Sequence, residues 1–307
     1  MLAILIIAAV VILLLAVLYV FYYRVFYSPK KDMSETVSPR SISRHKYRDL
    51  VQERIGELDA LPCQLIHTRS DDGLRLSARY YEGDEDKPLF LCFHGYRGSA
   101  LRDLSGFGLH LIRQNYPVIL IDERAHWRSQ GHTITFGIKE RYDVMSWINF
   151  ANRRFGTDKP IYLYGISMGG ASVLMASGLE LPENIRGIIA DCPFNSPKDI
   201  IKHVCRRIRL KPDLCWPFIW LSALIWGRFR INATSAAREV QNAKKPILII
   251  HGEADTFVPM RMSQEVAQAN PAMTEMHTVP EAGHGLSYYY DTDSYLTWIK
   301  EFMEKTT

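Results

Sequence analysis

The stretch that most constrains the fold of this chain is residues 161–172. A short apolar run there leads into Gly165-Ile-Ser-Met-Gly169 and then into small and apolar residues. A serine between a buried strand and a helix stands out of a tight turn, and glycines two residues before and after it leave room where a Cβ would collide with neighbouring backbone. The pattern therefore predicts a nucleophile elbow at Ser167, although five such residues can also coincide by accident in a chain with 19 glycines.

Short apolar runs recur along the chain and predict a mostly parallel sheet. Parallel strands are buried on both faces, so they read as near-continuous apolar runs. Such runs occupy residues 88–93, 117–121, 160–164, 185–190 and 246–250, after a hairpin-like pattern at 64–69 and 74–81. Helical patterns lie around residues 104–114, 139–154, 171–178, 260–269 and 288–305. The alternation predicts an α/β fold, a mostly parallel central sheet with helices on both faces.

Residues 193–240 interrupt this alternation, because they separate two expected strands by far more than a usual crossover. The segment is basic at first and then apolar over residues 214–227, with tryptophans at positions 216, 220 and 226. Fourteen residues are too few to span a bilayer. We expect a helical cap insertion over the carboxyl edge of the sheet, where sites of such folds lie.

The N-terminus carries a different kind of pattern. Residues 2–23 hold no charge and are dominated by Leu, Ile, Val and Ala, long enough to cross a hydrocarbon core of about 30 Å. A cleaved signal peptide is the competing interpretation, but no basic residue precedes the run and the aromatic stretch before Arg24 is a poor cleavage site. The sequence therefore predicts a single transmembrane helix with an aromatic belt at its end.

The flanking charges predict the orientation of the chain and its division. Residues 1–50 hold seven Lys or Arg against three Asp or Glu, all after the apolar run. The positive-inside rule then puts the main domain in the cytoplasm, tethered to the cell membrane. We expect an anchor over residues 1–27, a basic juxtamembrane linker over 28–54 and a catalytic domain over 55–307. The body is otherwise charge-balanced, which gives no indication of nucleic-acid binding.

The five cysteines are irregularly spaced and favour reduced, structural thiols over a disulfide framework. No Cys-x-x-Cys pair or histidine cluster indicates a metal, and no cofactor is implied. The oligomeric state is left open by the sequence.

A serine hydroxyl needs a base to accept its proton and a carboxylate to orient that base. Asp255 follows the apolar run at 246–250, with Glu253 as a rival and a plain surface acid as a further alternative. His284 lies between glycines after a partly apolar stretch. The order Ser167, Asp255, His284 is the one expected of an α/β-hydrolase.

Acyl transfer also needs donors for the developing oxyanion. We expect the backbone N–H of Met168, directly after the serine, and that of Tyr96, in the loop that follows residues 89–93. His94 in the same loop is expected to brace it rather than to transfer protons.

On these motifs the chain resembles the α/β-hydrolase superfamily over residues 65–303. It is most similar to bacterial hydrolases of the serine-aminopeptidase and cinnamoyl-ester-hydrolase branches, including forms with an N-terminal membrane anchor. One motif departs: Ala125-His-Trp-Arg-Ser129 has Trp127 where such proteins commonly have glycine. A residue forced to positive φ there predicts strain or a reshaped loop, and we expect an altered pocket wall. Asp122 and His126 are expected to be structural.

Together these features predict a membrane-anchored serine hydrolase of the carboxylesterase or lipase type, which cleaves a carboxylic ester through an acyl-enzyme. The substrate is expected to be a small-molecule ester. The apolar anchor and the tryptophan-rich segment favour a hydrophobic or lipid-like acyl compound, and the alternative is that those tryptophans only pack the cap on the core. An acyltransferase or a peptidase with the same three residues is an alternative. A non-catalytic interaction protein on the same fold is another.

Overall fold

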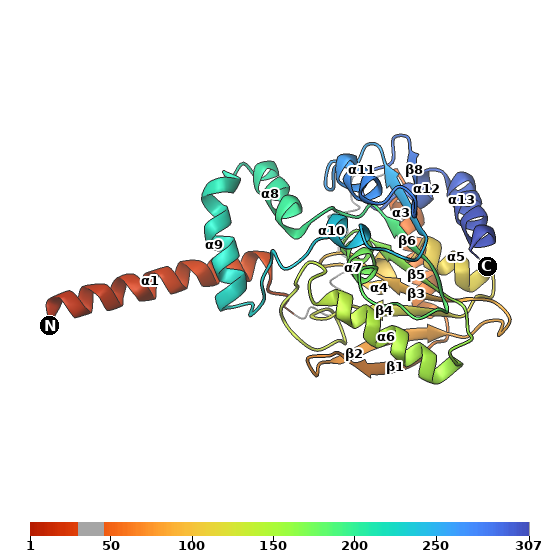
Figure 1. The fold of residues 1–307 in the computed structure, drawn as a ribbon, viewed down its shortest axis with the longest axis horizontal. Coiled ribbons are helices and arrows are strands. Elements are labelled where there is room, and N and C mark those ends of the chain that lie inside the picture. Colours follow the sequence, from red (N-terminus) through yellow and green to blue (C-terminus); the bar gives the residue numbers. More distant parts are fainter. Residues whose placement is uncertain (30–45, 307) are drawn as a thin grey trace.

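The computed structural model describes residues 1–29 and 46–306, and its centre is one eight-stranded sheet (Figure 1). The strand order is β1-β2-β4-β3-β5-β6-β7-β8, in which only β2 runs against its neighbours. The strands are β1 (Gln64–Arg69), β2 (Arg75–Tyr81), β3 (Leu89–Phe93), β4 (Val118–Asp122), β5 (Ile161–Ile166), β6 (Ile185–Asp191), β7 (Ile247–Gly252) and β8 (Thr274–Val279). The expected mostly parallel α/β sheet is confirmed.

Two apolar layers cover the sheet, one on each face. Successive side chains of a strand point to opposite faces, so Leu89, Leu91 and Phe93 join one layer while Phe90 and Cys92 join the other. The first layer includes α6 (Glu140–Phe155), α7 (Met168–Ala176), α10 (Ala236–Val240) and α11 (Met260–Ala269); the second includes α3 (Arg48–Ala60), α4 (Ala100–Asp103), α5 (Phe107–Arg113), α12 (Ser287–Tyr290) and α13 (Thr292–Lys305).

Two of the expected helices differ in the structure. The helix expected around residues 104–114 begins only at Phe107, as α5, because a turn containing Gly106 splits this region into α4 and α5. A Cβ at Gly106 would press into the ring of Tyr288, so this close approach requires glycine. The helix expected at 288–305 is likewise split into α12 and α13 at Asp291, whose side chain accepts a hydrogen bond from the N–H of Ser294 and caps α13.

Helix α1 (Leu2–Val25) projects from the domain, and it is long and apolar enough to cross a membrane (Figure 1). By length and apolar composition alone it could equally be a signal sequence. Its last turns are nevertheless built into the fold: Leu18, Tyr22 and Phe26 are buried, and the ring of Phe26 packs edge-on against Phe136. Just beyond the helix, Tyr27 forms an isolated β-bridge with Thr133.

The stretch expected to be a linker is partly helical. Residues 30–45 lie outside the described part of the chain, but α3 runs across the boundary drawn at residue 54. Its buried side chains Val51, Ile55 and Leu58 recur at helical spacing and pack into the second layer. This end of the expected linker therefore belongs to the packed domain.

The long segment between β6 and β7 is helical, in line with the expectation of helices there. It forms α8 (Pro197–Arg207), α9 (Pro212–Ile225) and α10. Helix α10 packs against α7 and α11, whereas α9 lies against α1, away from the sheet (Figure 1). The segment thus joins the projecting N-terminal helix to the body of the protein.

Candidate active site

Ser167 occupies the turn between β5 and α7. Its φ of 56° is in the left-handed region, and its N–H donates to the carbonyl of Asp191 at 2.8 Å. A Cβ at Gly165 would overlap the backbone of Gly169, and a Cβ at Gly169 would overlap the carbonyl of Phe93. The two glycines therefore allow strand and helix to approach closely enough for this strained turn, as the sequence pattern predicted.

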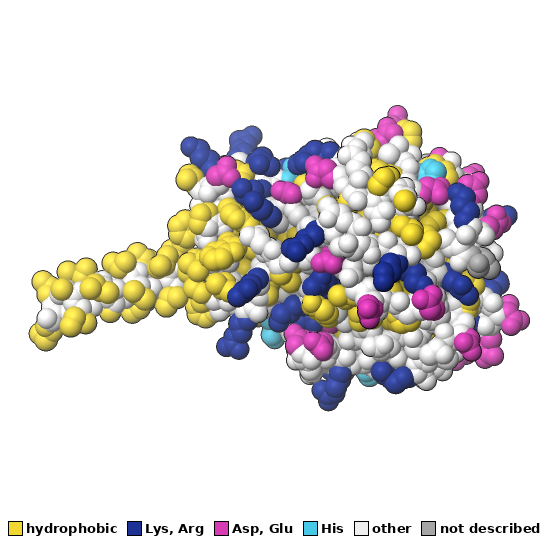
Figure 2. Space-filling model, viewed as in Figure 1, with side chains coloured by type: hydrophobic (Ala, Val, Ile, Leu, Met, Phe, Trp, Pro, Cys, Tyr) yellow, Lys and Arg dark blue, Asp and Glu magenta, His cyan; other side chains and the backbone are white. Residues whose placement is uncertain are grey.

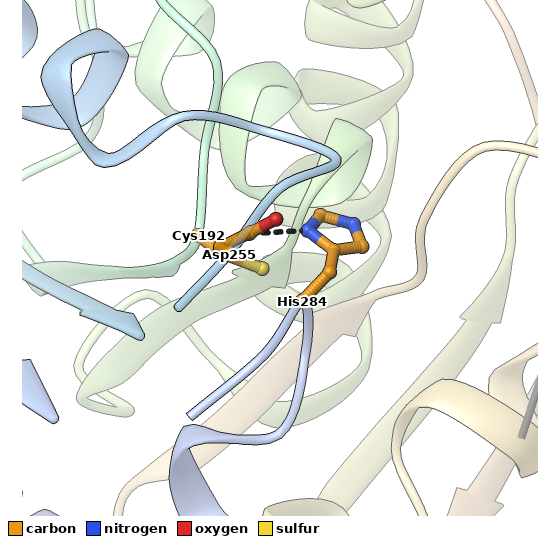
Figure 3. A group of neighbouring side chains, drawn as sticks. All are labelled: Cys192, Asp255 and His284. Atoms are coloured by element: carbon orange, nitrogen blue, oxygen red, sulfur yellow. Dashed lines mark hydrogen bonds and ion pairs between the residues drawn. The ribbon is translucent and has the colours of Figure 1, made fainter. Parts of the chain in front are cut away.

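His284 joins Ser167 to Asp255, residues that lie 117 and 29 positions away from it in the chain. Its Nε2 lies 2.9 Å from Ser167 Oγ. Its Nδ1 lies 2.6 Å from Asp255 Oδ2, the contact drawn as a dashed line in Figure 3. A carboxylate can only accept, so Nδ1 carries the hydrogen and Nε2 is free to accept from the serine hydroxyl. The structure thus brings together the three residues that the sequence nominated.

The loop around Asp255 fixes its carboxylate. Oδ1 accepts hydrogen bonds from the N–H groups of Phe257 and Val258, both at 2.8 Å, and the side chain is fully buried. Burial by itself would raise the pKa of Asp255, but the facing His284 and His251 together lower it below its ordinary value. The rival acid Glu253 instead accepts from Thr278 on an exposed side of the loop.

The sequence analysis did not identify His251, yet this residue of β7 lies against the carboxylate of Asp255. Its Nε2 lies 3.4 Å from Asp255 Oδ2 and 2.9 Å from the carbonyl of Val258. Its Nδ1 lies 2.7 Å from Ser263 Oγ, a hydroxyl that also reaches the carbonyl of Pro193 at 3.0 Å. The ring therefore ties the Asp255 loop to α11.

The loop after β3 is held by two buried groups. The N–H of Gly95 donates to Asp103 Oδ2 at 2.8 Å, and Asp103 also accepts from Arg102. His94 accepts the N–H of Glu123 at Nε2, so its Nδ1–H donates to the carbonyl of Gly95. Burial lowers the pKa of His94, which keeps the ring neutral in this bracing position.

His126, in the loop that follows β4, holds the loop after β3 in place. Its Nε2 accepts the N–H of Arg97 at 3.1 Å, and its Nδ1 lies 2.8 Å from the carbonyl of Arg124. Burial lowers the pKa of His126 to about 3, so it too is neutral. Trp127, the next residue, has a φ of 38°, in keeping with the strain expected at a position that commonly holds glycine.

The backbone N–H groups of Tyr96 and Met168 lie on the two segments that flank the serine. Within residues 1–29 and 46–306, neither N–H group donates a hydrogen bond to a backbone carbonyl. Met168 opens α7, where the first N–H groups of a helix have no intrahelical partner. Of the two residues, Tyr96 lines the pocket above Ser167, whereas Met168 is buried directly after the serine.

A buried thiol adjoins the acid and the base. Figure 3 shows Cys192 next to Asp255 and His284. The Cys192 Sγ, a carboxylate oxygen of Asp255 and a ring nitrogen of His284 all lie within 4.8 Å of one another, and Cys192 has a φ of 44°. Burial raises the pKa of the Cys192 thiol well above its ordinary value. Since Asp255 and the Nδ1 of His284 are bonded to each other, this donor set does not fit a metal centre.

A pocket of about 650 Å³ opens above Ser167. Its wall is built from the loop after β3, the Asp255 and His284 loops, and Val51, Arg207 and Tyr289 from α3, α8 and α12. Trp127 is not part of this wall, so the expected change there was wrong: the strained residue packs beside the second apolar layer instead. The tryptophans of the 193–240 segment do not line it either, and Arg207 alone represents that segment.

The comparisons with known proteins agree with this architecture. The family described as serine aminopeptidase, S33 matches residues 84–230, and the dienelactone hydrolase family matches residues 223–301. A structure of the Pyrococcus furiosus esterase Pf2001 superimposes with a TM-score of 0.65 at 19% identity, covering 91% of this chain and 97% of that one. The chain thus has the α/β-hydrolase fold.

The relatives that resemble this chain by sequence are distant. It is 23% identical to the uncharacterized protein YqkD of Bacillus subtilis over 230 residues, 73% of this chain and 74% of YqkD. It is 26% identical to the lysophosphatidylserine lipase ABHD12 of Danio rerio over 203 residues, 62% of this chain and 49% of that protein.

Proposed function

We propose that this α/β-hydrolase is a serine esterase that works through an acyl-enzyme. The observation that carries the proposal is His284, whose two ring nitrogens lie 2.9 Å from Ser167 Oγ and 2.6 Å from Asp255 Oδ2. In this arrangement Nε2 takes the hydroxyl proton as Oγ attacks an ester carbonyl, and Asp255 stabilises the imidazolium that forms.

The remaining steps use the same groups. The attack places negative charge on the former carbonyl oxygen, and in this proposal the backbone N–H groups of Tyr96 and Met168 bind that oxygen. His284 then returns the proton to the departing alcohol oxygen, which leaves the acyl group on Ser167. Water attacks this ester in turn with His284 as base, and the acid is released with the serine restored.

The reaction is tested with p-nitrophenyl esters and the Ser167→Ala variant. Loss of the nucleophile is expected to lower kcat/KM by at least about 10³-fold, because only binding and the oxyanion donors remain. Cys63→Ser, a change at an exposed thiol, serves as the matched control and keeps full activity. Equal rates for wild type and Ser167→Ala would overturn the esterase proposal.

We further propose a membrane-bound, lipid-like ester as the substrate. Support comes from the apolar α1 and from the relative described as a lysophosphatidylserine lipase. Arg97 and Arg207 line the pocket. The Arg207 guanidinium lies 5.6 Å from the centre of the Phe257 ring, which in turn packs against the His284 ring. A cationic wall suits an ester whose alcohol part carries a phosphate or carboxylate.

Two lysolipids with the same acyl chain test this substrate class. Arg207→Ala is expected to raise KM for an anionic lysophospholipid and to leave KM for a neutral monoacylglycerol unchanged. If both KM values move together, Arg207 does not read the charge of the headgroup. If short soluble esters are turned over faster than either lysolipid, the substrate is not lipid-like.

We also propose that α1 anchors the protein in the cell membrane, with the catalytic domain in the cytoplasm. The burial of Leu18, Tyr22 and Phe26 at the end of α1 supports retention of the helix, since cleavage after it would remove buried core. The basic residues that follow α1 support the orientation. A reporter enzyme active only outside the cytoplasm, fused after the C-terminus, is expected to be inactive, and an active fusion would reverse the orientation.

A further inference from the structure

Helix α9 carries an apolar face that the described protein does not cover. Leu214 is 67% exposed, and five more large apolar side chains are each about 40% exposed. These are Phe218, Trp220, Leu224, Ile225 and Trp226. Within α9 only Ile219, Ser222 and Ala223 are buried, and Trp226 directly follows the last residue of the helix. A contiguous apolar surface of this kind marks an interaction site in a soluble environment.

This face is continuous with the surface of α1. The ring of Phe218 stacks on Phe21 at 5.6 Å, and the ring of Trp226 packs edge-on against Tyr19 at 5.1 Å. Figure 2 shows the hydrophobic side chains running without a break from α1 onto the neighbouring region. Whatever solvent surrounds the exposed side of α1 therefore also reaches α9.

The direction of α9 limits how it can meet a membrane. In Figure 1 it runs across α1 rather than along it, at the end of α1 nearest the domain. If α1 crosses a bilayer, α9 then lies roughly parallel to the membrane plane, at the level of the interface. Its 14 residues are too short to span, and tryptophans favour the headgroup level.

Basic residues border α9 on both sides in the chain. Lys202, Arg206, Arg207, Arg209 and Lys211 precede it, and Arg228 and Arg230 follow it. Asp213 is the acidic residue within α9, and Lys202 is paired with it at 2.7 Å. Figure 2 shows Lys and Arg side chains around the edge of the apolar region. An apolar helix face with a basic border is complementary to anionic phospholipid headgroups.

We propose that the exposed face of α9 is a second membrane-contacting surface, inserted in the plane of the leaflet beside α1. This inference rests on the proposed insertion of α1, and its occupant is the lipid bilayer. Arg207 lies in the wall of the pocket and just before α9, so contact at α9 holds that wall next to the headgroup layer. An ester in the leaflet then reaches Ser167 without crossing bulk water.

The test uses the full chain in nanodiscs that contain phospholipids brominated close to the headgroup. Bromine quenches a tryptophan that it contacts, so part of the wild-type fluorescence is expected to be lost. In the Trp220→Phe, Trp226→Phe double variant the quenchable fraction is expected to fall by more than half. Trp298→Phe is the matched control, because Trp298 stacks on His277 away from α9, and it is expected to leave the quenched signal unchanged.

Quenching that is the same in the double variant as in wild type would overturn the inference. The inference would also be overturned if each nanodisc held two copies of the chain and Trp220 and Trp226 were not quenched. A second chain, and not the bilayer, would then cover α9. A Val10→Trp variant, quenched by deeply brominated lipid, reports insertion of α1 separately. Ester hydrolysis in the same discs separates a failure at α9 from a failure of the esterase proposal.

Discussion

The hydroxyl of Tyr96 donates a hydrogen bond to the carbonyl oxygen of Val25 at 2.8 Å, which links the loop beside Ser167 to the last turn of α1. The neighbouring Arg97 adds hydrogen bonds to the carbonyls of Arg24 and Tyr27, at 3.0 and 2.9 Å. The last carbonyls of a helix lack intrahelical partners. Side chains from the expected oxyanion loop satisfy them here, so α1 and this loop form one unit.

Tyr96→Phe is therefore expected to lower kcat on a soluble ester while KM changes little. The variant keeps the backbone N–H of residue 96 but leaves the Val25 carbonyl without this donor, which costs about 0.5–1.5 kcal/mol, or roughly two- to tenfold if the loop alone carries it. Tyr142→Phe, which removes an exposed hydroxyl bonded to Arg141, is the control. An unchanged kcat in Tyr96→Phe would show that α1 does not position the loop.

Gly169→Ala is expected to reduce both stability and activity. The added Cβ would overlap the carbonyl of Phe93, so either β3 or the start of α7 must move, at a cost of about 1–3 kcal/mol or more. Gly56→Ala is the control: Gly56 lies within α3, has no atom within 4 Å of an added Cβ, and is expected to gain up to about 1 kcal/mol. Urea unfolding in detergent micelles measures both, and equal midpoints would contradict the role of Gly169.

Asp191→Asn is expected to flatten part of the pH dependence of stability. Burial raises the pKa of Asp191 to about 6, only partly opposed by Tyr295 and the two nearby histidines. Between pH 4 and 6 the folded protein keeps a proton that the unfolded chain loses, so the free energy of unfolding falls as pH rises. Over this pH interval the ionisation of Asp191 lowers the free energy of unfolding by about 2–3 kcal/mol.

The variant has no such ionisation, so it is expected to lose less stability than wild type between pH 4 and 7. Unfolding free energies of the two proteins at both pH values test this, because the other acids titrate alike in each. A difference between the two proteins that stays constant with pH would rule out a raised pKa at Asp191.

Asp255→Asn is expected to lower kcat by about 10³-fold or more, with the fold unchanged. An amide at this position no longer fixes Nδ1–H of His284 and no longer balances an imidazolium. Glu253→Gln changes the rival acid in the same loop and is expected to leave kcat as in wild type. If Glu253→Gln were the more damaging of the two, the acid would have been assigned to the wrong residue.

The elbow and its partners were accessible to prediction because each has a local signature. Gly165 and Gly169 flank Ser167 at fixed spacing, and Asp255 and His284 follow the ends of neighbouring strands. Parallel strands bring such ends to one edge of a sheet whatever their separation in the chain. The central strands were predictable because both of their faces are covered, so each reads as a short run of apolar residues.

What the sequence missed depends on contacts between distant segments or on weak patterns. Nothing local to Tyr96 indicates that its hydroxyl meets Val25, 71 positions away. Strand β8 is an edge strand in which five of the six residues are only half-buried, so it lacks the apolar run of the inner strands. Helix α3 has only three buried residues among charged ones, yet their spacing at 51, 55 and 58 could have revealed it.

A fluorophosphonate probe reacts with an activated serine. It therefore measures whether Ser167 acts as the nucleophile that forms a covalent acyl intermediate. Labelled protein is digested and the modified peptide is located by mass spectrometry. We expect one adduct, on Ser167, which is absent from Ser167→Ala and strongly reduced in a His284→Ala variant. Labelling of wild type no greater than that of Ser167→Ala, or an adduct on another residue, would contradict the account.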